Sequence, residues 1–504
     1  MTTRTLVQGL RRAAERNADK PAVVTPGRTL SYSELDGAAD RVAGGLRELG
    51  IARGDRVAIV LPNAAETPQA IYGVLRCGAA FAPINPTIKE DKLTRLLEHV
   101  GAAAVVCDSE RSPVVRSAAK RAGGIPVVAD VAALQSAGTP PSPAPLDADL
   151  AAVIYTSGST GEPKGVTMTH GNMSFVAGSI IEYLEMGPAD RILSVLPLSF
   201  GYGLYQLLTC VEAQATLVLE PGLGLPGRVV QVLEQEQITG LPGVPTVFGV
   251  LISLRGLADR ELPHLRFLTN AGAAMPEATI EAVRRTFPGA RLYSMYGQTE
   301  CTRVCYLPPD QLDVRPTSVG VPIPGTEAWI EDDDGKVAAP GEVGELIVRG
   351  SHVMQGYWRD PEGTAERLRP GRWPWDRVLA TGDLFRQDPE GYLYFVGRRD
   401  DMIKSRGEKV APREVEEILH AIPGVREASV VGVPDRLLGQ AVHAHVAPET
   451  GLRLDADEIR RCCAQQLETH KVPRRVVFHA ALPRTANGKI DRNVLFERDP
   501  GRAA

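Results

Sequence analysis

Long apolar runs are missing from this 504-residue sequence. No stretch reaches the roughly 18 apolar residues that a helix needs to cross a bilayer. The first residues, starting at Met1, also lack the apolar centre of a secretory signal. We therefore expect a cytoplasmic protein with no membrane span.

Cysteine is scarce and is not arranged for cross-linking. The seven cysteines are an odd number, and no pair has CxxC spacing, which argues against a disulfide framework or a structural zinc site. Cys301 and Cys305 lie close together, but no histidine accompanies them at ligand spacing. Reduced thiols are the expectation.

A charge excess of one sign is also missing. The 56 basic and 61 acidic residues leave a formal charge of −5, which argues against a nucleic-acid partner. Hydrophobic residues make up 43 %, an ordinary share for a globular protein, so general disorder is excluded.

The first 300 residues alternate short apolar runs with amphipathic stretches. Strands are expected at 57–61, 81–84, 103–107, 192–196, 216–219, 265–268 and 292–293, and helices at 66–76, 89–99, 204–212, 227–236, 247–254 and 277–286. This alternation predicts an α/β fold, in which helices flank parallel sheets.

The pattern changes after about residue 315. Alternating residues at 327–330 and 345–349 flank the turn signal Asp333-Asp334-Gly335, which predicts a small β subdomain at about 315–395. A segment with the order αββαβ follows the charged cluster near residue 400. We expect a large N-terminal domain over 1–399 and a mobile small α+β domain over 400–504.

A loop rich in glycine and hydroxyl side chains follows the apolar run 150–155. It extends from Thr156 to Gly165, and its backbone N–H groups, hydroxyls and Lys164 suit a phosphate. It is neither a Walker A loop, because Lys164 precedes Gly165 and Val166, nor a nucleophile elbow.

This loop resembles the signature of the adenylate-forming (ANL) superfamily, which includes acyl-CoA synthetases and other acid–thiol ligases. Four further segments follow in that superfamily's order: 296–300 (YGQTE), 381–383 (TGD), 397–404 (GRRDDMIK) and 483–489 (PRTANGK). The resemblance covers nearly the whole chain. It implies an enzyme that uses ATP and Mg²⁺ to convert a carboxylic acid into an acyl-AMP.

The resemblance also assigns roles in the first half-reaction. Glu300 would hold magnesium, Thr299 would contact the α-phosphate, and Lys489 would bridge the carboxylate and the α-phosphate. The implied ATP- and AMP-binding residues are Thr156, Ser157, Gly158, Ser159, Thr160, Gly161, Lys164, Ala271, Gly272, Ala273, Tyr296, Gly297, Gln298, Asp383 and Arg398. Tyr296 would stack on adenine, and Asp383 and Arg398 would reach the ribose.

Lys489 lies in the predicted small domain and the phosphate loop in the large one, so the two domains must close on each other. The resemblance implies that the small domain then rotates about Asp400. Arg406, Gly407 and Glu408 would line the tunnel for the incoming thiol.

The acid itself is less well defined by the sequence. Phe200, Gly201, Tyr202 and Tyr205 are candidates for the acyl pocket. Gly201 stands where amino-acid-activating relatives carry an aspartate, and a buried ammonium without a counter-charge is costly. The surroundings read as apolar, which favours a fatty or aryl acid.

Alternatives for the acceptor remain open. The thiol is expected to be that of CoA, although the phosphopantetheine arm of an acyl carrier protein presents the same group. A non-thiol nucleophile is a further alternative. The sequence is compatible with a monomer or a homodimer.

Overall fold

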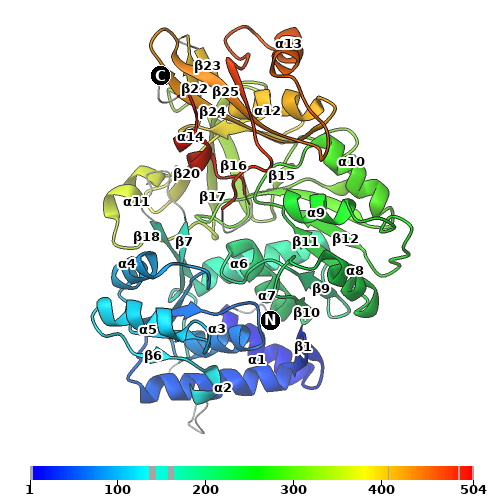
Figure 1. Ribbon diagram of the computed structural model, residues 1–504. Coiled ribbons are helices and arrows are strands. Elements are labelled where there is room, and N and C mark those ends of the chain that lie inside the picture. Colours follow the sequence, from blue (N-terminus) through cyan, green and yellow to red (C-terminus); the bar gives the residue numbers. More distant parts are fainter. Residues whose placement is uncertain (1–3, 135–143, 157–163, 407, 486–488, 502–504) are drawn as a thin grey trace.

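The computed structural model describes residues 4–134, 144–156, 164–406, 408–485 and 489–501. It shows an α/β fold in which a large N-terminal domain of mixed sheets carries a small C-terminal α+β domain (Figure 1). In Figure 1 the small domain, orange to red, lies above the large one.

One sheet of the large domain has seven strands in the order β18-β8-β7-β4-β3-β5-β6. Strands β4, β3, β5, β6 and β7 run parallel, whereas β8 and β18 pair antiparallel at one edge. The strands are β3 (Arg56–Val60), β4 (Ala80–Pro83), β5 (Ala104–Cys107), β6 (Val127–Val128), β7 (Leu150–Thr156), β8 (Lys164–Thr169) and β18 (Gly356–Tyr357).

A second sheet has nine strands in the order β15-β14-β13-β12-β11-β9-β10-β1-β2. Strands β13, β12, β11, β9, β10 and β1 are parallel. The strands are β1 (Pro21–Thr25), β2 (Arg28–Ser31), β9 (Arg191–Ser194), β10 (Thr216–Leu219), β11 (Gly240–Gly243), β12 (Phe267–Asn270), β13 (Arg291–Tyr296), β14 (Cys305–Tyr306) and β15 (Val321–Pro322).

Helices cover these sheets, and apolar residues from both sheets and several helices form one continuous core. The helices of the large domain are α1 (Leu6–Arg16), α2 (Tyr32–Glu48), α3 (Glu66–Arg76), α4 (Glu90–Val100), α5 (Ser112–Arg121), α6 (His170–Leu184), α7 (Gly201–Ala213), α8 (Pro226–Gln235), α9 (Pro245–Ile252), α10 (Glu277–Thr286) and α11 (Pro361–Arg367). Helices α1, α2 and α6 begin with capping boxes at Thr5, Ser31 and Thr169, which satisfy N–H groups that the helix leaves free.

The predicted β subdomain is an antiparallel sheet in the order β16-β17-β20-β19, with β21 also paired to β20. Its strands are β16 (Thr326–Glu331), β17 (Val343–Gly350), β19 (Leu368–Pro370), β20 (Arg377–Gln387) and β21 (Leu393–Arg398). The hairpin of β16 and β17 encloses Asp333 and Asp334, as the sequence predicted.

The small domain packs three helices against one sheet of order β23-β22-β25-β24, with β26 beside β25. Its elements are β22 (Ile403–Ser405), β23 (Glu408–Val410), α12 (Pro412–Ala421), β24 (Val425–Asp435), β25 (Gly439–Pro448), α13 (Ala456–Gln466), β26 (Arg475–Phe478) and α14 (Arg492–Glu497). Buried Val415, Leu419, Val430, Val442 and Ile459 belong to its separate core.

In the part of the chain that the structure describes, none of the helices is both long and apolar enough to cross a membrane. All seven cysteines are free thiols, and no cluster of described residues could hold a metal ion through three or more histidine, cysteine or acidic side chains.

Candidate active site

Several predicted site residues lie at one edge of the nine-stranded sheet because parallel strands end there together. Asn270 at the end of β12 pairs with Ser294 of β13, so Ala271 and Gly297, which follow the two strands, emerge side by side. Phe200 follows β9 at the same edge and caps α7. The carboxyl edge of a parallel sheet is the usual ligand-binding edge of α/β folds.

Tyr296, Asp383 and Arg398 form one hydrogen-bonded group. The Tyr296 hydroxyl donates to Asp383 Oδ2 at 2.5 Å, and Arg398 Nε donates to Asp383 Oδ1 at 3.1 Å. Asp383 and Arg398 face each other across strands β20 and β21. The structure thus brings Tyr296 to Asp383, which follows it by 87 positions, and to Arg398, which follows Asp383 by 15.

The carboxylate of Asp383 is buried, and this raises its pKa; Arg398 and the Tyr296 hydroxyl oppose the rise. Burial, together with the nearby Asp383 charge, also holds the pKa of Tyr296 well above its ordinary value. The Tyr296 ring packs against Phe385 with centroids 4.8 Å apart. Its predicted stacking on adenine stays a prediction.

A second group surrounds Glu300. The Tyr357 hydroxyl donates to Glu300 Oε1 at 2.7 Å, and the Lys164 ammonium lies 4.9 Å from the centre of the Tyr357 ring. Strand β18 carries Tyr357 beside Val166 of β8, two residues after Lys164. A cation and a carboxylate therefore lie close together at the base of the predicted phosphate loop.

Only the ends of that loop are within the described residues. Thr156 pairs with Lys164 across β7 and β8, so the loop connects the two strands of a hairpin. Ser157, Gly158, Ser159, Thr160 and Gly161 lie outside the described part of the chain.

Glu300 fits the predicted magnesium site. Its carboxylate is half-buried, and its one described side-chain partner is a neutral phenol, so oxygen lone pairs remain available. Carboxylate oxygen is a ligand type that Mg²⁺ prefers.

The intervening residues Gly297, Gln298 and Thr299 form the turn after β13. A Cβ on Gly297 would lie 2.2 Å from the Thr302 carbonyl oxygen, so only glycine fits there. Gln298 donates to the Thr381 carbonyl at 3.4 Å, which ties this turn to the strand of Asp383. Thr299 is half-buried between Gln298 and Glu300.

Lys489 reaches the same edge from the small domain. A Cβ built on Gly272, whose φ is +85°, would lie 3.6 Å from Lys489 Cε and 3.8 Å from Phe200 Cζ. The Asn270 side chain donates to the Ala273 carbonyl at 3.2 Å and holds this turn. The structure therefore places Lys489, Gly272 and Phe200 around one small space.

The hairpin of Lys489 is held by the Thr485 N–H, which donates to the Lys489 carbonyl at 2.8 Å. Lys489 keeps contact with solvent, yet the surrounding protein lowers its pKa. Partial removal from water is the first cause, and the Arg398 guanidinium the second; Asp383 opposes both. Lys489 thus lies within electrostatic range of the Tyr296–Asp383–Arg398 group.

The predicted hinge and tunnel residues that the structure describes lie in an exposed turn and an exposed hairpin. Asp400 is exposed in the turn between β21 and β22. Arg406 and Glu408 are exposed on the β22–β23 hairpin, which Figure 1 shows high in the small domain, away from the large one. Gly407 lies outside the described residues.

The candidate acyl-pocket residues lie on or before α7. Tyr202 and Tyr205 are buried, with the Tyr202 hydroxyl 2.6 Å from Thr269 Oγ1 and the Tyr205 hydroxyl 3.3 Å from Thr302 Oγ1. A Cβ on Gly201 would meet nothing within 4 Å, so there is open space beside it.

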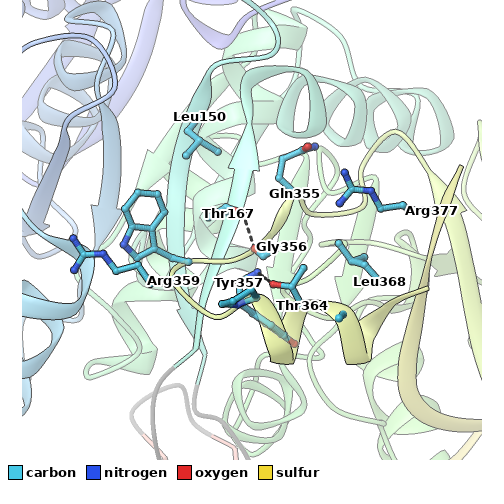
Figure 2. Close-up of a pocket in the computed structure, with 12 residues that line it drawn as sticks. Leu150, Thr167, Gln355, Gly356, Tyr357, Arg359, Thr364, Leu368 and Arg377 are labelled. Atoms are coloured by element: carbon cyan, nitrogen blue, oxygen red, sulfur yellow. Dashed lines mark hydrogen bonds between the residues drawn. The ribbon is translucent and has the colours of Figure 1, made fainter. Parts of the chain in front are cut away.

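A depression of about 520 Å³ borders the site (Figure 2). It lies around β18 and α11, where Thr167 Oγ1 donates to the Gly356 carbonyl at 2.6 Å, and it shares Tyr357 with the Glu300 group. Neither Asp383 nor Lys489 lines it. The depression is therefore separate from the space beside Gly272 that Lys489 and Phe200 border.

Two family models match the chain. The model described as "AMP-binding enzyme" matches residues 10–358, and the model described as "AMP-binding enzyme C-terminal domain" matches residues 414–489. The chain belongs to the AMP-binding enzyme family.

Individual relatives place it in the acyl-CoA ligase branch of the adenylate-forming superfamily. A feruloyl-CoA synthase from an Amycolatopsis species is 34 % identical, and the match covers 95 % of this chain and 96 % of the relative. A long-chain-fatty-acid–CoA ligase from Salmonella typhimurium is 32 % identical, with 99 % and 95 % covered. The ATP-bound structure of MatB from Rhodopseudomonas palustris has a TM-score of 0.90 and 29 % identity, with 98 % of both chains covered.

Two residues of the site escaped the sequence analysis. Tyr357, the partner of Glu300, lies in a two-residue strand far from any motif, and no local signal marks it. Arg303 lies in the segment 301–307, which is apolar apart from Thr302 and Arg303 itself, and it is only 3 % exposed. A charge within an apolar segment was the available signal.

Proposed function

We propose that this AMP-binding enzyme uses ATP to convert a carboxylic acid into an acyl-AMP and then transfers the acyl group to the thiol of CoA. The observation that carries the proposal is the position of Lys489. A lysine of the small domain lies beside Gly272 and Phe200 of the large domain, within electrostatic range of Asp383 and Arg398.

In the first half-reaction, a carboxylate oxygen attacks the α-phosphorus of ATP. A P–O bond forms, the bond to the β-phosphate breaks, and pyrophosphate leaves. Negative charge gathers on the α-phosphate, so fixed cations and N–H donors stabilise the transition state. Lys489 supplies that charge to the α-phosphate and the carboxylate, and Thr299 contacts the α-phosphate.

The remaining motif residues hold the nucleotide in this proposal. Asp383 accepts hydrogen bonds from the ribose hydroxyls, with Arg398 beside it. Residues Ala271 to Ala273 and Tyr296 to Gln298 form the adenine site. The loop from Thr156 to Lys164 binds the β- and γ-phosphates. Glu300 would hold Mg²⁺, which neutralises phosphate charge when bound.

The second half-reaction needs a thiol where Lys489 lies in this structure. We propose that the small domain, residues 400–504, rotates about Asp400 against the large domain, residues 1–399, once pyrophosphate has left. This rotation would bring Arg406, Gly407 and Glu408 to the site. The thiol sulfur then attacks the acyl carbon, AMP leaves, and the thiol proton passes to solvent. Hinge closure and reopening is a known form of domain motion.

The acyl group would enter the space beside Phe200, Gly201, Tyr202 and Tyr205. The named activities of the relatives, on feruloyl and long-chain fatty acyl groups, support aryl and fatty acids as the first classes to test. The same relatives, named for CoA products and matched over nearly the full chain, support CoA over a carrier protein as the acceptor.

Product analysis tests the proposal. Purified protein is incubated with Mg·ATP and a panel of aryl, fatty, hydroxy, dicarboxylic and amino acids, with and without CoA, and the products are read by mass spectrometry. AMP, pyrophosphate and an acyl-CoA from one class of acid are the expected products. Acyl-AMP that accumulates despite CoA would instead point to a carrier protein or a non-thiol nucleophile.

A further inference from the structure

A buried positive charge lies among the residues assigned to the acyl pocket. Arg303 follows Glu300 by three positions, in the connection between β13 and β14, and is only 3 % exposed. Its neighbours Cys301, Val304 and Cys305 are fully buried. The sequence led us to expect an apolar pocket, so this guanidinium needs its own explanation.

Arg303 has no counter-charge in the part of the chain that the structure describes. No aspartate or glutamate there forms an ion pair with it, and its buried Nε lacks a hydrogen-bond partner. Its described side-chain contact is with the face of the Tyr202 ring, 5.3 Å from the guanidinium carbon. A buried arginine is costly unless an anion pairs with it, so such an arrangement is rare in a finished core.

The phenols around Arg303 do not supply the missing charge. The Tyr202 hydroxyl bonds to Thr269, the Tyr205 hydroxyl to Thr302, and the Tyr183 hydroxyl donates to Met295 Sδ at 3.1 Å. Burial raises the pKa of Tyr202 to about 12 even against the opposing effect of Arg303. Burial also raises the pKa of Tyr183 and Tyr205. All three therefore stay neutral near pH 7.

The guanidinium lies deeper in the site than the space around Lys489. Tyr202, which it contacts, comes two residues after Phe200 on α7, and the Tyr202 hydroxyl bonds to Thr269 within β12. Gly272, against which Lys489 packs, follows the end of that strand. An acid whose carboxylate reacts beside Lys489 would thus direct its far end past the open space at Gly201, towards Arg303.

We propose that Arg303 binds a second anionic group at the far end of the acid, so that the substrate is a dicarboxylate or a carboxylic acid carrying a sulfonate. The planar guanidinium matches either oxyanion with two parallel hydrogen bonds, and binding would supply the counter-charge that the protein lacks. This inference rests on the proposed function, because it assigns the other end of the same acid. It adds a second anionic group to the aryl or fatty acid proposed above.

Matched pairs of acids test the assignment. Dicarboxylic acids of increasing length are compared with their monomethyl esters and with ω-sulfonated acids of the same length, and kcat/KM for AMP formation is measured for each. The wild-type protein is expected to prefer one anionic acid over its ester by at least about a hundredfold, because a buried site built for a polar group rejects a substrate that lacks it. Comparing the ω-sulfonated acids with the dicarboxylic acids of the same length shows whether Arg303 binds a sulfonate or a carboxylate.

Variants then assign that preference to Arg303. In Arg303→Met, kcat/KM for the anionic acid should exceed kcat/KM for the ester by only about tenfold or less. Arg303→Lys should keep part of the preference, because lysine retains the positive charge but cannot form two parallel hydrogen bonds. Arg285→Met is the matched control, since Arg285 is 72 % exposed on α10 and pairs with Glu281. It should leave the ratio of the two kcat/KM values unchanged.

Melting temperature separates a substrate-binding role from a structural one. Removing an unpaired buried charge should leave the melting temperature of Arg303→Met unchanged or higher. A lower value, an ester used as well as the anionic acid, or a ratio that neither Arg303 variant changes would overturn the inference. Such results would leave the proposed function intact, whereas failure of every acid to release AMP would overturn that function itself.

Discussion

Replacing Asp383 by asparagine tests the nucleotide site most sharply, because the structure shows which further hydrogen bonds the carboxylate can accept. Oδ2 accepts the Tyr296 hydroxyl at 2.5 Å and Oδ1 accepts Arg398 Nε at 3.1 Å. Each carboxylate oxygen can accept two hydrogen bonds, so each retains one acceptor position. Two acceptors on one carboxylate suit the two neighbouring hydroxyls of a ribose.

The expected magnitude follows from this geometry. Asparagine replaces one carboxylate oxygen by an NH2 donor and leaves the other as a neutral acceptor, so one ribose hydrogen bond is lost and the second is weakened. A hydrogen bond to a charged group contributes about 1.5–3 kcal/mol and one between neutral groups about 0.5–1.5 kcal/mol, so the combined cost is about 3 kcal/mol. That cost corresponds to a fall of roughly 150-fold in kcat/KM for ATP. The side chain of Asp383 is only 6 % exposed, so water does not replace the lost acceptor.

The assay combines the variant with a modified nucleotide. Wild-type protein supplied with 2′,3′-dideoxy-ATP should lose about as much activity as Asp383→Asn supplied with ATP. Combining variant and analogue should cost little more than either alone, because both remove the same bonds. Asp334→Asn, a change at a side chain that is 78 % exposed, is the control and should behave as wild type. If the fold-losses of the variant and of the analogue multiply when the two are combined, the assignment of Asp383 to the ribose is refuted.

Three further predictions concern the hinge, the core and the turn after β13. Asp400→Pro should still form acyl-AMP but make acyl-CoA at least about tenfold more slowly, because the turn can no longer rotate; a normal rate of acyl-CoA formation would exclude Asp400 as the hinge. Burial lowers the pKa of His352 to about 4, so between about pH 6.5 and 4 the unfolded chain binds one proton more than the folded protein. The free energy of unfolding therefore decreases by up to about 3 kcal/mol as the pH is lowered across that window. The melting temperature of His352→Phe should therefore fall less than that of the wild type when the pH is lowered from 7 to 5. An equal fall would contradict this role of His352. Gly297→Ala should destabilise the protein by about 1–3 kcal/mol in thermal or urea unfolding, because its Cβ would meet the Thr302 carbonyl oxygen at 2.2 Å; wild-type stability would show that the turn can adapt.

Most elements of the fold could be predicted because their periodicity is local. Helices α3 and α10 and strand β10 have the predicted bounds. Strand β11 was missed, since Gly240–Gly243 contains two glycines and a proline, and only its buried position between β9 and β12 makes it a strand. Strand β8 was missed because it was read as the end of the loop that it closes.

The candidate site divides in a similar way. Motif residues such as Asp383, Tyr296 and Lys489 could be named from the sequence, and the structure brings them to one space. Their mutual bonds could not be predicted, because the strands that carry Tyr296 and Asp383 belong to different sheets. Arg303 was missed for another reason: the sequence shows a charge within a mostly apolar segment, but only the three-dimensional arrangement shows that this charge is buried without a described counter-charge.

Comparing the two half-reactions in Lys489→Ala tests the proposed role of this lysine. Acyl-AMP formation from acid and Mg·ATP should fall by about 10²–10³-fold or more, because a fixed charge at the reacting phosphate is lost. Thioester formation from a supplied acyl-AMP and CoA should stay within about tenfold of wild type, since Lys489 has left the site by then. Lys336→Ala, at a side chain that is 78 % exposed, should change neither rate. An equal loss in both half-reactions of Lys489→Ala, or normal acyl-AMP formation, would contradict the account.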